Sequence, residues 1–373
     1  MIFKIKLNIV DKKKALESLY EETINLGFKN PLVICDKIFS KDTYIKKCIK
    51  KFRKRFITFS CEPTYEQLDK ELKLLRERKY YDCIIGIGGG SALDFAKGLA
   101  LLLKNPGKSS EYMGFPKNLN PPLPVIAIPT TVSTGSEVIF NAVFTDKKNK
   151  KKLGINTELN YPVLSILDTK LIKKAPNDVI YQSAISSLMR SIETFTSVDS
   201  NNITKFFSLK SYEILSKTLA SKIKNDNYYK NLQWGCIFSM VALSNSSGGP
   251  CGVINYYLSV HFNIPQALSY NFTAIEFFKQ NIKKGYFEYA NLIDNNKNLN
   301  KLAKVNKFIM NLKKIVLKNN KKIKLAKISL KFNPDLKENI YKIYKNMNFV
   351  QLKKNPVKIN KNDLKEIIER IIK

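Results

Sequence analysis

Hydrophobic and polar positions alternate in two different ways over the first half of the chain. Short apolar runs, such as those within residues 31–37 and 82–88, predict strands that are covered on both faces. Between the runs, apolar residues recur at helical spacing, as in residues 13–27 and 65–79. Since this alternation continues to about residue 172, it predicts a mostly parallel, doubly wound α/β sheet.

The pattern changes after Pro176, where strands give way to long helical periods. These periods cover residues 178–198, 204–223, 229–246 and 251–262, and lysine-rich ones follow to the end. A chain of 373 residues is long enough for two domains. We therefore predict a doubly wound nucleotide domain over residues 1–173 and an all-helical domain over residues 174–373.

One stretch joins a strand, a turn and a helix in immediate succession. Three glycines, Gly88, Gly89 and Gly90, follow an apolar run, and Ser91 opens the next helical period. Glycines lack a Cβ that would obstruct a pyrophosphate, and the free N–H groups at a helix start attract an anion. The stretch therefore predicts a phosphate site, with a tight structural turn as the alternative.

A second apolar run ends in small hydroxyl residues. Residues 129–137 read Pro-Thr-Thr-Val-Ser-Thr-Gly-Ser-Glu, and residues 88–97 read Gly-Gly-Gly-Ser-x-x-Asp-x-x-Lys. Together these stretches resemble the iron-containing alcohol dehydrogenase family, which is related in fold to glycerol dehydrogenases and dehydroquinate synthases. Ser191-Ile-Glu193 is similar to a later landmark of that family, and the resemblance covers roughly residues 30–270.

The resemblance implies that the first domain binds NAD. Asp36 falls at the place that selects the cofactor, because a carboxylate accepts bonds from the adenosine ribose and repels the 2′-phosphate of NADP. An aspartate that only caps the turn before Lys41 is the alternative. The other cofactor-binding positions that the resemblance implies are Gly88, Gly89, Gly90, Ser91, Asp94, Thr130, Thr131, Thr134, Asn141, Val143 and Lys152.

The family holds a divalent metal with one aspartate and several histidines of its helical domain, and this chain departs from that pattern. The corresponding positions are Ser186, Arg190, Gly252 and Gln266. The chain has a single histidine, His261, and it falls outside these positions. Because one histidine cannot build a site of several, we expect neither iron nor zinc of the family type.

Arg190 changes the chemistry that the helical domain offers. A guanidinium repels a divalent cation but binds a carboxylate, phosphate or carbonyl oxygen well. We therefore predict Arg190, Tyr256 and Gln266 as catalytic residues that polarise a carbonyl, with Tyr256 at the place of a further family histidine. A decayed site, in which Arg190 pairs with Glu193 or another acid, is the alternative.

Three functions follow from these residues. The first is an NAD-dependent, alcohol dehydrogenase-like oxidoreductase that acts on an alcohol, an aldehyde or a sugar-derived carbonyl without a metal. The second is a catalytically inactive, nucleotide-binding homologue. The third is a non-redox enzyme that acts on an anionic metabolite. A small-molecule substrate that carries a negative charge and a homodimeric assembly are both compatible with the resemblance.

The formal charge of +33 invites a nucleic-acid interpretation. The positive residues are mostly lysines in helical patterns without interleaved stacking aromatics, and they accompany many Asn and Ile residues, as an AT-rich genome would produce. We expect no specific nucleic-acid partner. No segment is as apolar as a membrane span, and residues 1–10 are too charged for a signal peptide, so we expect a cytoplasmic protein.

Overall fold

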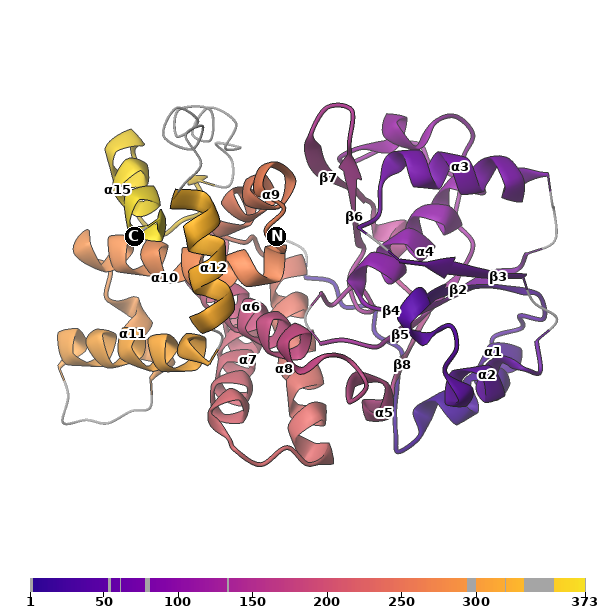
Figure 1. Ribbon diagram of the computed structural model, residues 1–373, viewed down its shortest axis with the longest axis horizontal. Coiled ribbons are helices and arrows are strands. Elements are labelled where there is room, and N and C mark those ends of the chain that lie inside the picture. The colour runs from indigo at the N-terminus through magenta and orange to yellow at the C-terminus, as the bar shows by residue number, and fades with distance from the viewer. Residues whose placement is uncertain are drawn as a thin grey trace. The chain divides into compact units, whose positions relative to one another are not determined.

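The computed structural model describes residues 3–52, 55–60, 62–77, 81–132, 134–293, 300–318, 320–331 and 352–372 (Figure 1). The chain forms two compact units, which meet in the sequence between Pro176 and Asn177. The first unit contains a parallel sheet with helices, and the described part of the second contains helices only. The predicted fold class is confirmed, while the domain boundary between residues 173 and 174 stays a prediction.

A six-stranded parallel sheet forms the centre of the first unit, in the order β1-β8-β5-β4-β2-β3. A separate antiparallel hairpin consists of β6 and β7. The strands are β1 Ile9–Asp11, β2 Pro31–Asp36, β3 Arg55–Phe59, β4 Cys83–Gly88, β5 Val125–Pro129, β6 Asn141–Asp146, β7 Lys151–Asn156 and β8 Leu164–Leu167.

Helices cover both faces of this sheet. They are α1 Leu19–Asn25, α2 Thr43–Ile49, α3 Tyr65–Arg76, α4 Gly90–Leu102 and α5 Thr169–Ile172. The helix that we predicted over residues 13–27 is shorter, because it begins with a 3₁₀ turn over Ala15–Ser18. Lys14 precedes this turn with a left-handed backbone (φ 57°), so a regular helix cannot extend through it.

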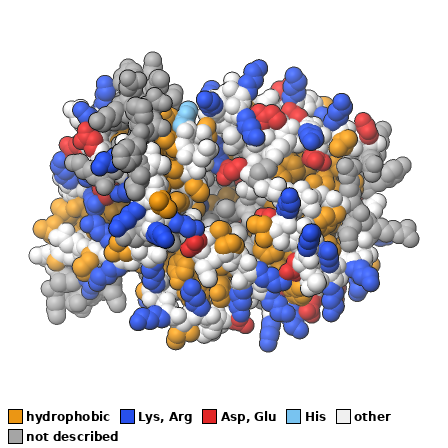
Figure 2. Space-filling view, in the orientation of Figure 1, with side chains coloured by type: hydrophobic (Ala, Val, Ile, Leu, Met, Phe, Trp, Pro, Cys, Tyr) orange, Lys and Arg blue, Asp and Glu red, His pale blue; other side chains and the backbone are white. Residues whose placement is uncertain are grey.

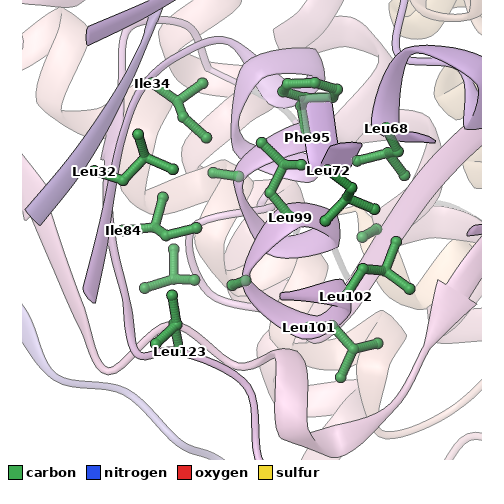
Figure 3. Close-up of a cluster of buried hydrophobic side chains, with 14 of the residues drawn as sticks. Leu32, Ile34, Leu68, Leu72, Ile84, Phe95, Leu99, Leu101, Leu102 and Leu123 are labelled. Atoms are coloured by element: carbon green, nitrogen blue, oxygen red, sulfur yellow. The ribbon is translucent and has the colours of Figure 1, made fainter. Parts of the chain in front are cut away.

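Alternate residues of the central strands pack on opposite faces of the sheet. Leu32, Ile34 and Ile84 pack against α3 and α4, and Figure 3 shows them beside Phe95 and Leu99. The residues between them in the strands pack against α1, α2 and α5, and these are Val33, Cys35, Ile85 and Ile87. Both faces are therefore buried, which explains why the strands read as continuous apolar runs.

The winding of the sheet reverses between β2 and β4. The chain runs from β2 to its neighbour β3 at the sheet edge, whereas from β4 it runs to β5 on the other side. The register pairs Cys35 with Ile87, so Asp36 and Gly88 end these two strands side by side. Ligands of open α/β sheets bind outside the carboxyl ends of the strands at such a reversal.

The second unit contains a central helix, α10, which packs against α6, α9, α11, α12 and α15. The described helices are α6 Asn177–Thr196, α7 Asn202–Ala220, α8 Asp226–Ser244, α9 Cys251–Phe262, α10 Gln266–Lys283, α11 Lys301–Leu317, α12 Asn320–Lys331 and α15 Lys361–Ile372. The helices that we predicted between residues 178 and 262 correspond to α6, α7, α8 and α9 and differ from them by up to three residues at each end.

Lysine and arginine side chains lie dispersed among acidic and apolar ones on the face that Figure 2 shows. Many of the lysines are exposed and pair with single acids, as Lys283 does with Glu366 at 2.8 Å. Surface pairs of this kind contribute little to stability, so these lysines form a solvated face. Within the ranges that the structure describes, no helix has the length and apolar character needed to cross a membrane.

Candidate functional site

The glycine block closes β4 and opens α4. Gly88 is the last residue of β4, Gly89 caps the helix with extended backbone (φ −73°, ψ −178°), and Gly90 is the first residue of α4. No side chain caps this helix end. The amides of Ala92 and Leu93 both donate to the Gly89 carbonyl at 3.1 Å. Among the described residues, no hydrogen bond is recorded for the amides of Gly90 and Ser91, and these amides can bind an anion, which the helix dipole also favours.

The threonine block, residues 129–137, lies directly against the glycine block, which consists of Gly88, Gly89 and Gly90. The Thr130 amide donates to the Gly88 carbonyl at 2.9 Å, which joins the ends of β5 and β4. A Cβ on Gly90 would lie 2.6 Å from Thr134 Oγ1, and a Cβ on Gly89 would lie 3.3 Å from Thr131 Oγ1. The structure therefore brings these predicted cofactor-binding residues together, in a cradle whose space depends on the missing Cβ atoms.

A buried hydroxyl at this cradle lacks a protein partner. Thr130 is fully buried, and its Oγ1 makes no hydrogen bond within the described part of the chain. An unpaired buried hydroxyl costs free energy, so such groups usually serve a ligand or an ordered water. Ser91 lies half-buried in the first turn of α4, close to the same helix end.

Asp36 lies beside the glycine block but already has one partner. A Cβ on Gly88 would lie 3.0 Å from Asp36 Cβ and 2.6 Å from Ala92 Cβ, so only glycine fits between them. Asp36 Oδ1 accepts a hydrogen bond from the Ile38 amide at 3.0 Å, and partial burial raises the pKa of the carboxyl. Asp36 therefore caps the turn. Its contact with the ribose of a cofactor stays a prediction.

The carboxylate of Asp94 already has hydrogen-bond partners within the protein. Its carboxylate accepts from Ser136 Oγ at 2.5 Å and from the Val143 amide at 3.0 Å, and it lies 3.6 Å from Lys97 Nζ. It therefore joins α4 to the threonine block and to β6. Burial raises the pKa of Asp94, and the positive charge of Lys97 opposes that shift. A direct contact of Asp94 with a cofactor stays a prediction.

Lys97, the last residue of the glycine motif in the sequence, is a positioning residue that our list of cofactor-binding positions does not include. Its side chain is 1% exposed, and its Nζ donates to the carbonyls of Ser136 at 3.0 Å, Ile139 at 3.1 Å and Asn141. Burial lowers the pKa of this ammonium, while the charges of Asp94 and Glu137 raise it. One side chain of α4 thus holds the whole loop between β5 and β6 in place.

Glu137 adds a second carboxyl to this buried group. It is 6% exposed, and burial raises its pKa to about 7, an effect that the nearby charge of Lys97 opposes. Two carboxyls and one ammonium therefore share a small buried volume behind the cradle. Because burial, and to a smaller extent the charge of Asp94, both disfavour the ionised form, Glu137 readily holds a proton near neutral pH.

The remaining predicted cofactor positions lie on the β6–β7 hairpin. Asn141 Nδ2 donates to Asn156 Oδ1 at 2.8 Å, and the Val143 amide is the donor to Asp94 described above. Lys152 is paired with Glu62 Oε2 at 2.5 Å. The β6–β7 hairpin is therefore linked to α4 through the bond between Val143 and Asp94. The contacts of Asn141, Val143 and Lys152 with a cofactor stay predictions.

In the helical unit, a buried carboxylate joins three helices. Glu193 of α6 is 4% exposed, its Oε1 accepts from the Cys251 amide of α9 at 3.1 Å, and its Oε2 accepts from the Tyr270 hydroxyl of α10 at 2.8 Å. A Cβ on Gly249 would overlap Glu193 Oε1 and lie 3.0 Å from Cδ. Burial raises the pKa of Glu193, and the charge of Arg190 opposes that shift.

Arg190 lies on an aromatic ring. Its guanidinium carbon is 5.0 Å from the centroid of the Tyr270 ring, a typical cation–π arrangement. The acid that we named as its partner in a decayed site, Glu193, and the nearby Asp199 both bind other groups as well. Glu193 binds Tyr270 and the Cys251 amide, and Asp199 pairs with Lys354 at 2.6 Å. Tyr270 was absent from our predicted site, although it lies four residues after Gln266, a spacing that shares a helix face.

The four positions that correspond to metal ligands in the resembled family do not offer metal ligands here. They are Ser186, Arg190, Gly252 and Gln266, which provide a buried hydroxyl with no hydrogen-bond partner among the described residues, a guanidinium, no side chain and an amide. The described residues include no group of three or more His, Cys, Asp or Glu side chains that could hold a metal. These positions therefore do not fit a divalent cation bound in the family's way. Tyr256 and Gln266 are half-buried, on α9 and at the start of α10.

The chain matches two family models. Residues 8–169 match the model of iron-containing alcohol dehydrogenase, and residues 180–372 match the C-terminal model of the Fe-containing alcohol dehydrogenase family. Alcohol dehydrogenase 4 of Schizosaccharomyces pombe is 29% identical over 251 residues, which cover 65% of this chain and 59% of the relative. Sulfoacetaldehyde reductase of Bilophila wadsworthia is 32% identical over 196 residues, 52% of this chain and 51% of the relative. The chain thus spans about half the length of these curated relatives.

A solved structure shares the fold. The crystal structure of sulfoacetaldehyde reductase from Bifidobacterium kashiwanohense in complex with NAD+ matches with a TM-score of 0.83 and 20% identity. The match covers 100% of this chain and 98% of the other. At this identity the likeness concerns the arrangement of helices and strands.

The first prediction separates two glycines of the cradle. Gly90→Ala should lower the free energy of unfolding by about 1–3 kcal/mol, because the new methyl group would overlap Thr134. Gly89→Ala should cost less, since its nearest neighbour is 3.3 Å away. Urea denaturation of both variants measures the difference. Equal losses of unfolding free energy in the two variants would mean that Thr134 does not limit the space at Gly90.

The second prediction concerns the pH dependence of stability. The pKa of Glu137 is raised from 4.5 to about 7 in the folded protein, so its contribution to stability is complete below about pH 4.5 and is lost as the pH rises through 7. Glu137→Gln should therefore gain stability relative to the unmodified protein between pH 5 and pH 8, by on the order of 2–3 kcal/mol. Urea denaturation at both pH values tests this, and parallel pH profiles would contradict it.

Proposed function

Because the chain belongs to the iron-containing alcohol dehydrogenase family, we propose that it is an NAD(H)-dependent oxidoreductase that interconverts an alcohol and an aldehyde or a sugar-derived carbonyl. The observation that carries this proposal is the cradle at the reversal of the sheet. It combines an uncapped helix start, glycines that leave room for a pyrophosphate and an unpaired buried hydroxyl at Thr130.

The residues of the first unit fit the cofactor. Gly88, Gly89 and Gly90 would hold the pyrophosphate with backbone amides, and the hydroxyls of Thr130, Thr131 and Thr134 would add donors, together with Ser91 at the helix start. Asp36 would accept a bond from the adenosine ribose with the oxygen that does not cap Ile38. Asn141, Val143 and Lys152 would border the nicotinamide half, with Asp94 holding the Val143 amide in place. The bound nicotinamide supplies the hydride.

The residues of the helical unit would carry the charge and the proton. Arg190 would donate to the carbonyl oxygen and stabilise the negative charge that develops there as the carbonyl carbon is reduced. Tyr256 would donate a proton to that oxygen, and Gln266 would hold the substrate with its amide. Each of these roles requires no metal, and the metal-ligand positions of this chain do not fit one.

The substrate that we favour is a small aldehyde with an anionic group. A guanidinium can bind a sulfonate, phosphonate or carboxylate as well as a carbonyl oxygen, and the chain carries a formal charge of +33. The relative from Bilophila wadsworthia is a sulfoacetaldehyde reductase, which makes sulfoacetaldehyde a suitable first probe. We further propose that the enzyme acts in the cytoplasm as a homodimer and without a nucleic-acid partner.

The third prediction tests the reaction. The purified protein should bind NADH saturably and reduce at least one aldehyde in a panel that includes sulfoacetaldehyde and neutral aldehydes. Arg190→Lys should lower kcat/KM by about 10²–10³-fold, since it keeps the charge but loses the planar donor fork. Gly89→Ala should weaken NADH binding while leaving the fold intact.

The outcomes of this experiment separate the three candidate functions. NADH binding without turnover on any member of the panel would favour the catalytically inactive homologue. Conversion of an anionic metabolite without net oxidation of NADH would favour the non-redox enzyme. Activity that survives Arg190→Ala unchanged would remove Arg190 from the mechanism but retain the oxidoreductase.

The fourth prediction concerns the metal. Turnover should persist after dialysis against EDTA, and elemental analysis should show less than one iron or zinc per chain, because the four family positions lack ligand side chains. Loss of activity in EDTA that added Fe²⁺ or Zn²⁺ restores would contradict the metal-independent mechanism. A metal that persists in a Gln266→Ala variant would indicate a site elsewhere in the chain.

A further inference from the structure

We propose that the ring of Tyr270 supports and orients the Arg190 guanidinium, an arrangement that we call the seat, and that Glu193 holds this ring in place. This inference rests on the proposed function, in which Arg190 is the electrophile. It adds two positioning residues, from α10 and α6, which no part of the predicted catalytic set contained. Tyr270 and Glu193 act through Arg190 rather than on the substrate.

The contact between Arg190 and Tyr270 suits an oriented donor. The guanidinium carbon lies 5.0 Å from the ring centroid, and the ring is 4% exposed, so the aromatic face is a fixed part of the protein interior. A guanidinium on an aromatic face keeps its N–H groups directed outward in the ring-parallel plane, where they can still donate to oxygen atoms. The contact with the ring therefore restricts the position of the Arg190 guanidinium.

The position of the ring is fixed from two other helices. The Tyr270 hydroxyl donates to Glu193 Oε2 at 2.8 Å, and Glu193 Oε1 accepts from the first amide of α9 at Cys251. No side chain of α9 itself caps that helix, so Glu193 also provides its N-terminal charge partner. Burial and the nearby Glu193 carboxylate both raise the pKa of Tyr270, so its phenol stays protonated and remains the donor.

The same three helices carry the positions of the family's metal ligands. Ser186 and Arg190 lie on α6, Gly252 on α9 and Gln266 on α10. In this chain Glu193 joins α6, α9 and α10 through the Cys251 amide and the Tyr270 hydroxyl, and these residues lie close in sequence to Arg190, Gly252 and Gln266. The site thereby keeps a defined geometry although its residues do not fit a metal.

Chemical rescue by free guanidinium tests the seat. Arg190→Ala should lose most aldehyde reduction, and guanidinium chloride at a concentration well below denaturation should restore part of it when an aromatic ring remains at position 270. The double variants are Arg190→Ala with Tyr270→Phe and Arg190→Ala with Tyr270→Leu. Both remove the hydroxyl, so the ring alone distinguishes them, and sodium chloride at equal ionic strength controls for salt.

We expect rescue in Arg190→Ala and in the Phe double variant, about 2- to 30-fold stronger than in the Leu double variant, as the strength of a cation–π contact implies. Circular dichroism and NADH affinity check that each variant is folded. Equal rescue of aldehyde reduction in the Leu and Phe double variants would contradict the proposed role of the Tyr270 ring. Single variants add a second measurement: Tyr270→Leu should lower kcat most, and Tyr270→Phe, which keeps the ring but loses its bond to Glu193, should lower it less.

A structural measurement separates this inference from the proposed function. Crystals of Arg190→Ala soaked in guanidinium should show the ion over the Tyr270 ring. If no aldehyde is reduced by the unmodified protein but the ion lies on the ring, the proposed reaction fails and the seat stands. An ion that binds elsewhere in these crystals overturns the seat, whether or not the protein is active.

Discussion

A single buried ammonium holds the candidate cofactor site together. Lys97 lies on α4, the helix whose first turn forms the anion site, and it donates to carbonyls of the loop that follows β5. The threonines that face the glycines belong to this same loop. Since a buried ammonium is costly without hydrogen bonds, the loop carbonyls and Lys97 stabilise each other. The spacing between the glycine and threonine blocks therefore depends on a residue that is remote from the phosphate position.

The fold could be predicted from the sequence because both strands and helices carry a clear periodicity. Leu32 and Ile34 alternate with Val33 and Cys35, and the two sets pack on opposite faces of the sheet. The glycine block also stood out, because successive glycines after an apolar run have few structural uses. The 3₁₀ turn at Ala15 was missed, because the backbone of Lys14 is set by its surroundings rather than by its residue type.

The candidate site could be predicted only where side-chain identity determines the role. Lys97 belongs to the glycine motif, but its role depends on backbone carbonyls, which every residue has, so the motif alone does not indicate that role. Asp36 has the right place for a ribose contact but also caps a turn, and its position alone does not separate the two roles. In the helical unit, Arg190 was evident as a replacement, whereas the ring beneath it became evident only when α6 and α10 were seen to pack together.

The contact between Gly249 and Glu193 also bears on how such a protein evolves. A methyl group at position 249 would overlap the carboxylate that joins α6, α9 and α10, so alanine there would displace Glu193 from its hydrogen bonds. A change of Glu193 to a shorter residue would release position 249 but would leave Tyr270 and the start of α9 without their acceptor. The two positions are therefore epistatic. A lineage that places a larger residue at position 249 must therefore also move or lose the carboxylate of Glu193.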